Sequence, residues 1–343
     1  MLLASLPRLF ARLVLTLAAT LTATSAALFA QSPSAIDGFN PDVDGNVYVL
    51  ATQPDGKLLV GGQFAHVGGF ARNNLARFNA DGSLDTTFNP NANGPVRALL
   101  IQGDNRIVVG GDFTTLQPGS TGTTTTRNRL ARLNADGTVD AGFNPNLGGQ
   151  LQPQVHALLL QPGGQIVAGG TFTTAQPTGL AASATRNYLA RFNADGSLDT
   201  AFNPNANAMV LALAAHVDNK IVVGGGFTSI GGDTRNRIAR LNANGTVDSE
   251  FNPDANNGVT SLAVQRDGKI VLGGFFTTLQ PPGDESPATR THLARLNVNG
   301  TLDSEFYPRA EGNVSTIALQ ADGALLIGGN FNAVWGRGSP SAA

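Results

Sequence analysis

An arginine and an aspartate recur eight residues apart in five segments of the chain. A guanidinium beside a carboxylate can form an ion pair, or it can position the carboxylate for acid–base chemistry. Catalysis needs one such pair, whereas five equivalent pairs indicate a repeated structural contact. Placed across two paired strands, each pair would add at most about 1 kcal/mol of stability. The sequence therefore predicts a cross-strand ion pair in each segment: Arg77 with Asp85, Arg132 with Asp140, Arg191 with Asp199, Arg240 with Asp248, and Arg295 with Asp303.

Other residues that could support chemistry are sparse or poorly spaced. Asn79, Asp81 and Asp85 resemble part of a calcium loop, but calcium needs about six to eight oxygen ligands. No glutamates are spaced to suggest the carboxylate pair of a glycosidase, and the absence of cysteine excludes thiol chemistry. The four histidines occupy different positions in their segments and lack metal-ligand spacing: His66, His156, His216 and His292. We expect no catalytic residue, no metal and no cofactor.

One column of residues varies where its neighbours do not. Each of six apolar stretches opens with a valine, and the residue after that valine is different every time. A ligand pocket that departs from the internal symmetry would look like this, although a position that nothing constrains would vary as well. The candidate ligand-binding residues are Tyr48, Arg97, His156, Leu211, Thr260 and Ser315.

These residues belong to a repeat of about 50 to 60 residues. Gly-Gly pairs mark it at Gly61, Gly110, Gly169, Gly224, Gly273 and Gly328. In one copy, apolar runs at 96–102 and 106–113 flank a tight turn, and further runs at 128–134 and 138–143 flank Asn-Ala-Asp-Gly. Both turns favour hairpins, because the residue after the Asp can take a positive φ. Four antiparallel strands per repeat predict an all-β fold, a six-bladed β-propeller, with a β-solenoid as the alternative.

The chain resembles the delta-60 repeat, a bacterial propeller-type family of uncharacterised function. The resemblance rests on four recurring motifs: Gly-Gly-x-Phe, Arg-Asn-x-Leu-Ala-Arg, Asn-x-Asp-Gly and Phe-Asn-Pro. The resemblance covers about residues 36 to 331. It implies a propeller in a secreted or surface protein, and it brings no catalytic residues with it.

The two ends depart from the repeat. Arg8 and Arg12 precede an uncharged run, which predicts a signal peptide over residues 1–30 and export, with a membrane anchor as the alternative. The repeat domain is expected over 31–331 and an irregular tail over 332–343. The last copy lacks its third strand, whereas residues 35–41 resemble a lone fourth strand. We therefore expect an incomplete last blade, partly closed by the N-terminal strand, as in a shortened form of a longer protein.

Loop lengths suggest where a partner binds. The link from Gly-Gly-x-Phe to the next arginine spans 8 residues in two copies and 14 in three, and the link over 146–154 is also lengthened. Both link types emerge on the same face of an up-and-down blade, and insertions mark either a binding face or simple tolerance. The evenly spread arginines and the net charge of −2 argue against nucleic acid.

The sequence thus favours a secreted, non-catalytic binding or scaffolding module that engages an extracellular protein or glycan, with no membrane span after signal removal. The alternatives are an enzyme acting on an extracellular polysaccharide at the channel mouth and a structural spacer of a larger surface protein.

Overall fold

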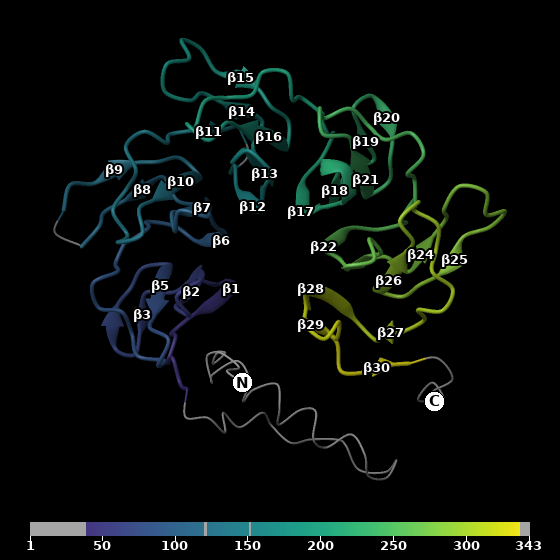
Figure 1. The fold of residues 1–343 in the computed structure, drawn as a ribbon, viewed down its shortest axis with the longest axis horizontal. Coiled ribbons are helices and arrows are strands. Elements are labelled where there is room, and N and C mark those ends of the chain that lie inside the picture. The colour runs from purple at the N-terminus through teal and green to yellow at the C-terminus, as the bar shows by residue number, and fades with distance from the viewer. Residues whose placement is uncertain (1–38, 120–121, 151, 337–343) are drawn as a thin grey trace, which may run out of the picture. The chain divides into compact units, whose positions relative to one another are not determined.

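The computed structural model describes residues 39–119, 122–150 and 152–336, whose regular secondary structure consists of short β-strands and one 3₁₀ turn (Figure 1). The predicted signal peptide over 1–30 lies outside the described residues. The described chain divides into two compact units. Unit 1 contains residues up to 108 together with 113–126 and 133–139, and unit 2 contains residues 109–112, 127–132 and those from 140 onward.

Each repeat begins with two strands that form a hairpin. The first strands are β1 (Asn46–Thr52), β6 (Val96–Ile101), β12 (Val155–Leu160), β17 (Val210–Ala215), β22 (Val259–Val264) and β28 (Asn313–Leu319). The second strands are β2 (Leu58–Gln63), β7 (Ile107–Gly111), β13 (Ile166–Gly170), β18 (Ile221–Gly225), β23 (Ile270–Gly274) and β29 (Leu325–Asn330). The tight turns predicted between them are confirmed, since Gly56 and Gly268 have φ of 83° and 80°.

A third strand follows in five repeats: β5 (Leu75–Phe78), β10 (Leu130–Leu133), β16 (Leu189–Phe192), β21 (Ile238–Leu241) and β26 (Leu293–Leu296). The antiparallel sheets run in the order β1-β2-β5 in unit 1, and β12-β13-β16, β17-β18-β21 and β22-β23-β26 in unit 2. Within unit 2 the first strands β12, β17, β22 and β28 are successive neighbours (Figure 1).

The prediction of a fourth strand in each repeat is wrong. After the Asp-Gly turn, residue Leu84 forms a single bridge with Phe78, and equivalent bridges are the whole extent of this strand in the other repeats. The strand ends because Asp85 Oδ1 accepts the backbone N–H of Thr87 at 3.1 Å, which turns the chain away from the ladder. Aspartate at this position therefore fixes a turn as well as an ion pair.

Short hairpins occupy the links between second and third strands. They are β3 (His66–Val67) with β4 (Phe70–Ala71), β8 (Thr115–Leu116) with β9 (Thr125–Thr126), β14 (Thr174–Ala175) with β15 (Ala184–Thr185), β19 (Ser229–Ile230) with β20 (Asp233–Thr234), and β24 (Thr278–Leu279) with β25 (Ala288–Thr289). We call these five the link hairpins. In unit 2, β11 (Leu147–Gly148) from a between-repeat link pairs with β14, so both kinds of link lie together as predicted.

The core lies between successive sheets. Val167 of β13, Phe202, Val210 of β17 and Ile221 of β18 are fully buried in one cluster. Glycine allows the sheets to approach, because a Cβ on Gly224 would lie 2.8 Å from Val259 Cγ1 of the next repeat.

The two ends differ in part from expectation. Phe39 packs edge-on against Phe78 of the first repeat, with 5.4 Å between ring centroids. Closure of the last sheet by the N-terminal strand stays a prediction, because residues 35–38 lie outside the described chain. The tail expected to be irregular contains β30 (Val334–Trp335), which pairs with β27 (Arg309–Ala310).

Candidate functional site

The predicted ligand-binding column occupies a β-bulge. The register of the first strand shifts across Tyr48, His156, Leu211, Thr260 and Ser315 in their repeats, and Arg97 has the same position in β6. A bulge inserts a residue that is left out of the ladder pairing. Release from this pairing explains why the column accepts six residue types. It supports the interpretation that the column varies because the fold does not constrain it.

Unit 1 brings two of these candidates into contact. The guanidinium carbon of Arg97 lies 4.9 Å from the ring centroid of Tyr48, a cation–π distance. The Tyr48 hydroxyl donates to Gln63 Oε1 at 2.9 Å, and the tyrosine is 41% exposed. Tyr48 and Arg97 therefore form a small exposed aromatic–cationic surface.

Unit 2 places the other four candidates on neighbouring first strands. The Thr260 hydroxyl donates to the backbone carbonyl of Val314 at 2.8 Å, so it joins two repeats. Leu211 and His156 are half-buried, and Ser315 is exposed. The assignment of all six residues to one ligand site stays a prediction.

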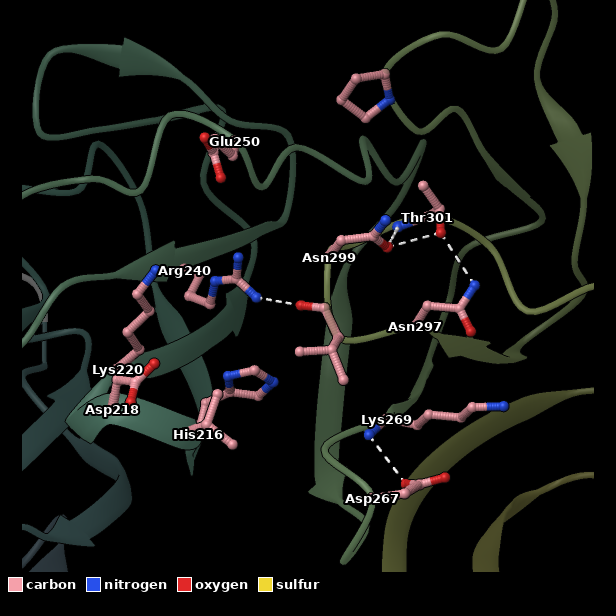
Figure 2. Close-up of a pocket in the computed structure, with 13 residues that line it drawn as sticks. His216, Asp218, Lys220, Arg240, Glu250, Asp267, Lys269, Asn297, Asn299 and Thr301 are labelled. Atoms are coloured by element: carbon pink, nitrogen blue, oxygen red, sulfur yellow. Dashed lines mark hydrogen bonds between the residues drawn. The ribbon is translucent and has the colours of Figure 1, made fainter.

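A cavity of about 820 Å³ lies at the opposite, tight-turn end of the fourth and fifth repeats (Figure 2). In Figure 2, Lys220, Asp218 and His216 lie on one side and Lys269, Asp267, Asn297 and Asn299 on the other. The first group comes from the short 3₁₀ turn η1 (Val217–Asn219) and its flanks, and the second from the two tight turns of the fifth repeat. The cavity is therefore built mainly from tight turns between strands, and Pro282 of the long link in the fifth repeat also lines it.

Side-chain hydrogen bonds hold these turns in shape. Asn299 Oδ1 accepts the backbone N–H and the hydroxyl of Thr301, at 3.1 and 2.7 Å. Asp267 Oδ1 accepts the backbone N–H of Lys269 at 3.1 Å. Asn and Asp make this local turn equally well, which explains how Asn299 replaces the aspartate of other copies.

The lysines of the cavity are bound by buried aspartates. Lys220 Nζ and Arg240 Nε lie 2.8 and 2.7 Å from Asp248 Oδ2, and Lys269 Nζ lies 2.8 Å from Asp303 Oδ2. Burial raises the pKa of Asp303, but hydrogen bonds from Lys269 and Arg295 outweigh it and lower the pKa to about 2. Asp248 and Asp303 therefore balance the charges of Lys220 and Lys269.

His216 is the unusual residue of the cavity. Its side chain is buried at 7% exposure, and Nε2 lies 3.0 Å from the Gly268 carbonyl, so we assign the proton to Nε2. Nδ1 is buried without a hydrogen-bond partner among the described residues. Burial lowers the pKa of His216, and the Arg240 and Lys220 charges lower it further despite the Gly268 bond, so the imidazole is neutral at pH 7. The cavity can offer this neutral acceptor and several polar turn groups to a ligand.

Sequence reasoning missed this cavity although a signal was present. His216 is the one histidine in a column of glutamines formed by Gln53, Gln102, Gln161, Gln265 and Gln320. In the third repeat Gln161 Oε1 accepts from Arg191 Nη1 at 3.1 Å. Comparison of the copies along this column would have singled out His216.

The link hairpins are a second set of candidate binding elements within each unit, with constant bases and variable tips. Val67, Leu116, Ala175, Ile230 and Leu279 anchor the bases as buried residues. Asn207 Oδ1 fixes one base by accepting the backbone N–H groups of Thr228 and Ser229, at 2.9 and 3.1 Å, and Asn93 and Asn256 do the same in their repeats. The tips are either Gly-Gly, at 68–69 and 231–232, or eight residues long, at 117–124, 176–183 and 280–287.

The long tips differ in chemistry as well as in length from the short ones. All three begin with Gln-Pro, and then one is rich in Thr, one contains Leu180 at 38% exposure, and one carries Asp284 and Glu285. Within the described ranges no cluster of three potential metal-binding side chains occurs. Those same ranges contain no helix with the length and hydrophobicity needed to cross a bilayer.

The chain has a clear match among protein families. The family described as "Domain of unknown function (DUF5122) beta-propeller" matches residues 53–88, 102–143, 161–202, 218–251 and 265–306. The first three stretches and the last run from the glutamine column to the phenylalanine of Phe-Asn-Pro or its variant. No curated protein matches the chain.

Solved structures with limited similarity include three of related size. The WD40 beta propeller domain of Doa1 has a TM-score of 0.43 and 14% identity, covering 83% of this chain and 90% of that one. A protein of unknown function from Bacteroides caccae has a TM-score of 0.41 and 14% identity, covering 75% and 79%. XC5397 from Xanthomonas campestris, a gluconolactonase, has a TM-score of 0.40 and 16% identity, covering 74% of both chains.

Proposed function

The chain belongs to the DUF5122 beta-propeller family, and on that premise we propose that it is a non-catalytic binding or scaffolding module. It is exported by its N-terminal segment and engages an extracellular protein or glycan through the tips of the link hairpins. Its six first strands support six blades, of which the last is incomplete.

The observation that carries this proposal is the contrast between hairpin bases and hairpin tips. The bases are held by the same buried anchor position in five repeats, whereas the tips change from two to eight residues. Rigid bases that carry variable loops are the usual arrangement of binding surfaces on β scaffolds. The fixed polar residues support a non-catalytic role, because Arg77, Arg132, Arg191, Arg240 and Arg295 all bind aspartates inside their own repeats.

Tip exchange tests the proposal, because the chain supplies its own short tip. Residues 176–183 and 280–287 are each replaced by Gly-Gly, as found at 231–232. The variants and the parent are screened on glycan arrays and against extracellular proteins, and melting temperature serves as the control for folding. We expect loss of binding with little change in melting temperature.

A companion variant distinguishes binding by the tips from binding by the candidate residues at the β-bulges of the first strands. Arg97→Ala combined with His156→Ala leaves every tip intact, so it should bind as the parent does. Equal binding by the tip-shortened and parent proteins would contradict the tips as the site. Turnover of a polysaccharide in a substrate panel would contradict the non-catalytic role.

A further inference from the structure

The sequence contains four Asn-Gly dipeptides, at 93–94, 244–245, 257–258 and 299–300. In such a dipeptide the backbone nitrogen of the glycine can attack the side-chain carbonyl carbon of the asparagine, because glycine has no Cβ that blocks the close approach. All four asparagines are exposed, so water reaches each of them. The dipeptides are therefore alike in sequence and exposure, and the local hydrogen bonds distinguish one from another.

Two of these asparagines are restrained inside tight turns. Asn244 Oδ1 accepts the backbone N–H and the hydroxyl of Thr246, at 3.0 and 2.8 Å. The nitrogen that would attack is also engaged, because the Gly245 N–H donates to the Asn242 carbonyl at 2.9 Å. Asn299 and the glycine after it make the same bonds in the fifth repeat. Attack on either side chain requires these bonds to break first.

Asn93 is restrained by a link hairpin. Its Oδ1 accepts the backbone N–H groups of Thr114 and Thr115, at 2.7 and 2.9 Å, and its Nδ2 donates to the Thr114 hydroxyl at 2.8 Å. The side-chain amide is thus fixed on the hairpin base. Loss of two or three ordinary hydrogen bonds slows a reaction at least about tenfold.

Asn257 has a different environment, in the link before β22. The preceding residue Asn256 binds the hairpin base, since its Oδ1 accepts the backbone N–H of Thr277 at 2.9 Å. The Gly258 N–H instead donates to Oδ1 of Asn257 itself, at 2.7 Å. The attacking nitrogen therefore lies beside the carbonyl group that it would attack, which is the placement that favours an intramolecular reaction.

We propose that Asn257 is a site of spontaneous deamidation and isomerisation. The Gly258 nitrogen forms a bond to Cγ of Asn257 as its proton passes to water. The side-chain amide nitrogen takes up a proton and leaves as ammonia. Water then opens the cyclic imide at one of its two carbonyls, which yields aspartate or isoaspartate.

Isoaspartate at this position disturbs the start of β22. The main chain then runs through the former side chain and gains a methylene group. The Gly258 carbonyl accepts the backbone N–H of Phe275 at 2.8 Å, and Val259 is fully buried, so the chain after Asn257 is held in place. We expect faster amide exchange at Phe275 in the isomerised protein. Asn257→Asp carries the same charge without the extra methylene and should keep the exchange of the parent.

Ageing of the full-length protein at neutral pH tests the proposal. After set times the protein is digested, and the asparaginyl, aspartyl and isoaspartyl peptides are quantified by chromatography and mass spectrometry. The rate at each dipeptide is divided by its rate in the urea-unfolded protein, so that effects of the sequence cancel. We expect this ratio to be at least about tenfold higher at Asn257 than at Asn93, Asn244 and Asn299. Equal ratios, or a higher ratio at any of the other three, would overturn the proposal.

Two variants test the geometry directly, with melting temperature as the control for folding. Gly258→Ala should slow the reaction at Asn257, and its Cβ would lie 3.6 Å from Phe275 Cδ2, an ordinary contact that the fold tolerates. Thr246→Ala removes an exposed hydroxyl donor, so it should speed the reaction at Asn244 severalfold. An unchanged rate at Asn257 in the first variant, or at Asn244 in the second, would contradict the proposal.

Discussion

Arg132 binds Asp140 across the second repeat, with 2.7 Å between Nε and Oδ2, and it also reaches the third repeat. Its Nη1 donates to the Ala194 carbonyl at 2.6 Å, and its guanidinium carbon lies 4.6 Å from the ring centroid of Phe143. The side chain was predicted to form a local ion pair. Because it also contacts the next turn, it joins successive repeats.

Arg132→Ala should therefore destabilise the protein by about 3 kcal/mol or more, because Asp140 loses its arginine in a largely buried place. Urea unfolding followed by circular dichroism measures this free energy. Arg106→Ala is the control, since its side chain is 43% exposed and surface changes cost about 0.5 kcal/mol or less. Equal losses in the two variants would contradict the joining role.

Arg132→Lys separates charge from shape. A lysine keeps the charge but cannot replace the planar fork that reaches Asp140, Ala194 and Phe143 together. We expect a stability between those of the parent and Arg132→Ala in the same urea experiment. Full recovery by lysine would mean that charge alone matters.

Stability should fall in acid through the aspartates of these pairs. An unfolded aspartate titrates near about 3.9, and the folded pKa of Asp303 is about 2. Between these values the unfolded chain binds more protons, so this contribution is present above about pH 4 and is lost as the pH falls toward 2. Asp303→Asn should cost more at pH 7 than at pH 2.5, measured by thermal melting, and an equal cost at both would contradict the assignment.

His216 should contribute a second pH dependence nearer neutrality. Its folded pKa is lowered from 6.5 by burial and by Arg240 and Lys220, opposed by the Gly268 hydrogen bond and by Asp218. The unfolded chain then binds the extra proton first, so this contribution is lost as the pH falls below 6.5. His216→Gln, which copies the other repeats, should lose less stability than the parent between pH 7.5 and 5.5. Parallel melting curves for both proteins would contradict this.

Close packing of the sheets should make Gly61 intolerant of a side chain. A Cβ at this position would lie 2.7 Å from Val96 Cγ1 and 2.8 Å from Val49 Cγ1. Gly61→Ala should cost about 1 to 3 kcal/mol, the usual range for overpacking a core. Gly103→Ala is the matched control, because no atom lies within 4 Å of its added Cβ. Similar costs for both would argue for a backbone effect instead.

Local chemistry made some features predictable. The Asp-Gly turns and the Arg–Asp pairs depend on residues within eight positions of each other, so the copies reveal them without a structure. Asn299 stands where other copies have aspartate, yet it makes the same turn bonds as aspartate does. The fourth strand was overestimated because the same aspartate that pairs with arginine also ends the strand.

The sequence by itself determined the repeat, the hairpins and the recurring Arg–Asp pairs, because each follows from contacts within one copy. Only the tertiary structure showed that Tyr48, Thr260 and their equivalents all lie at a β-bulge, because the register of a strand depends on the strand that faces it. It likewise brought His216 beside Gly268, 52 residues away, and showed Phe306 half-buried where Phe251 is covered. Such relationships arise between copies, where packing rather than local propensity sets which atoms meet.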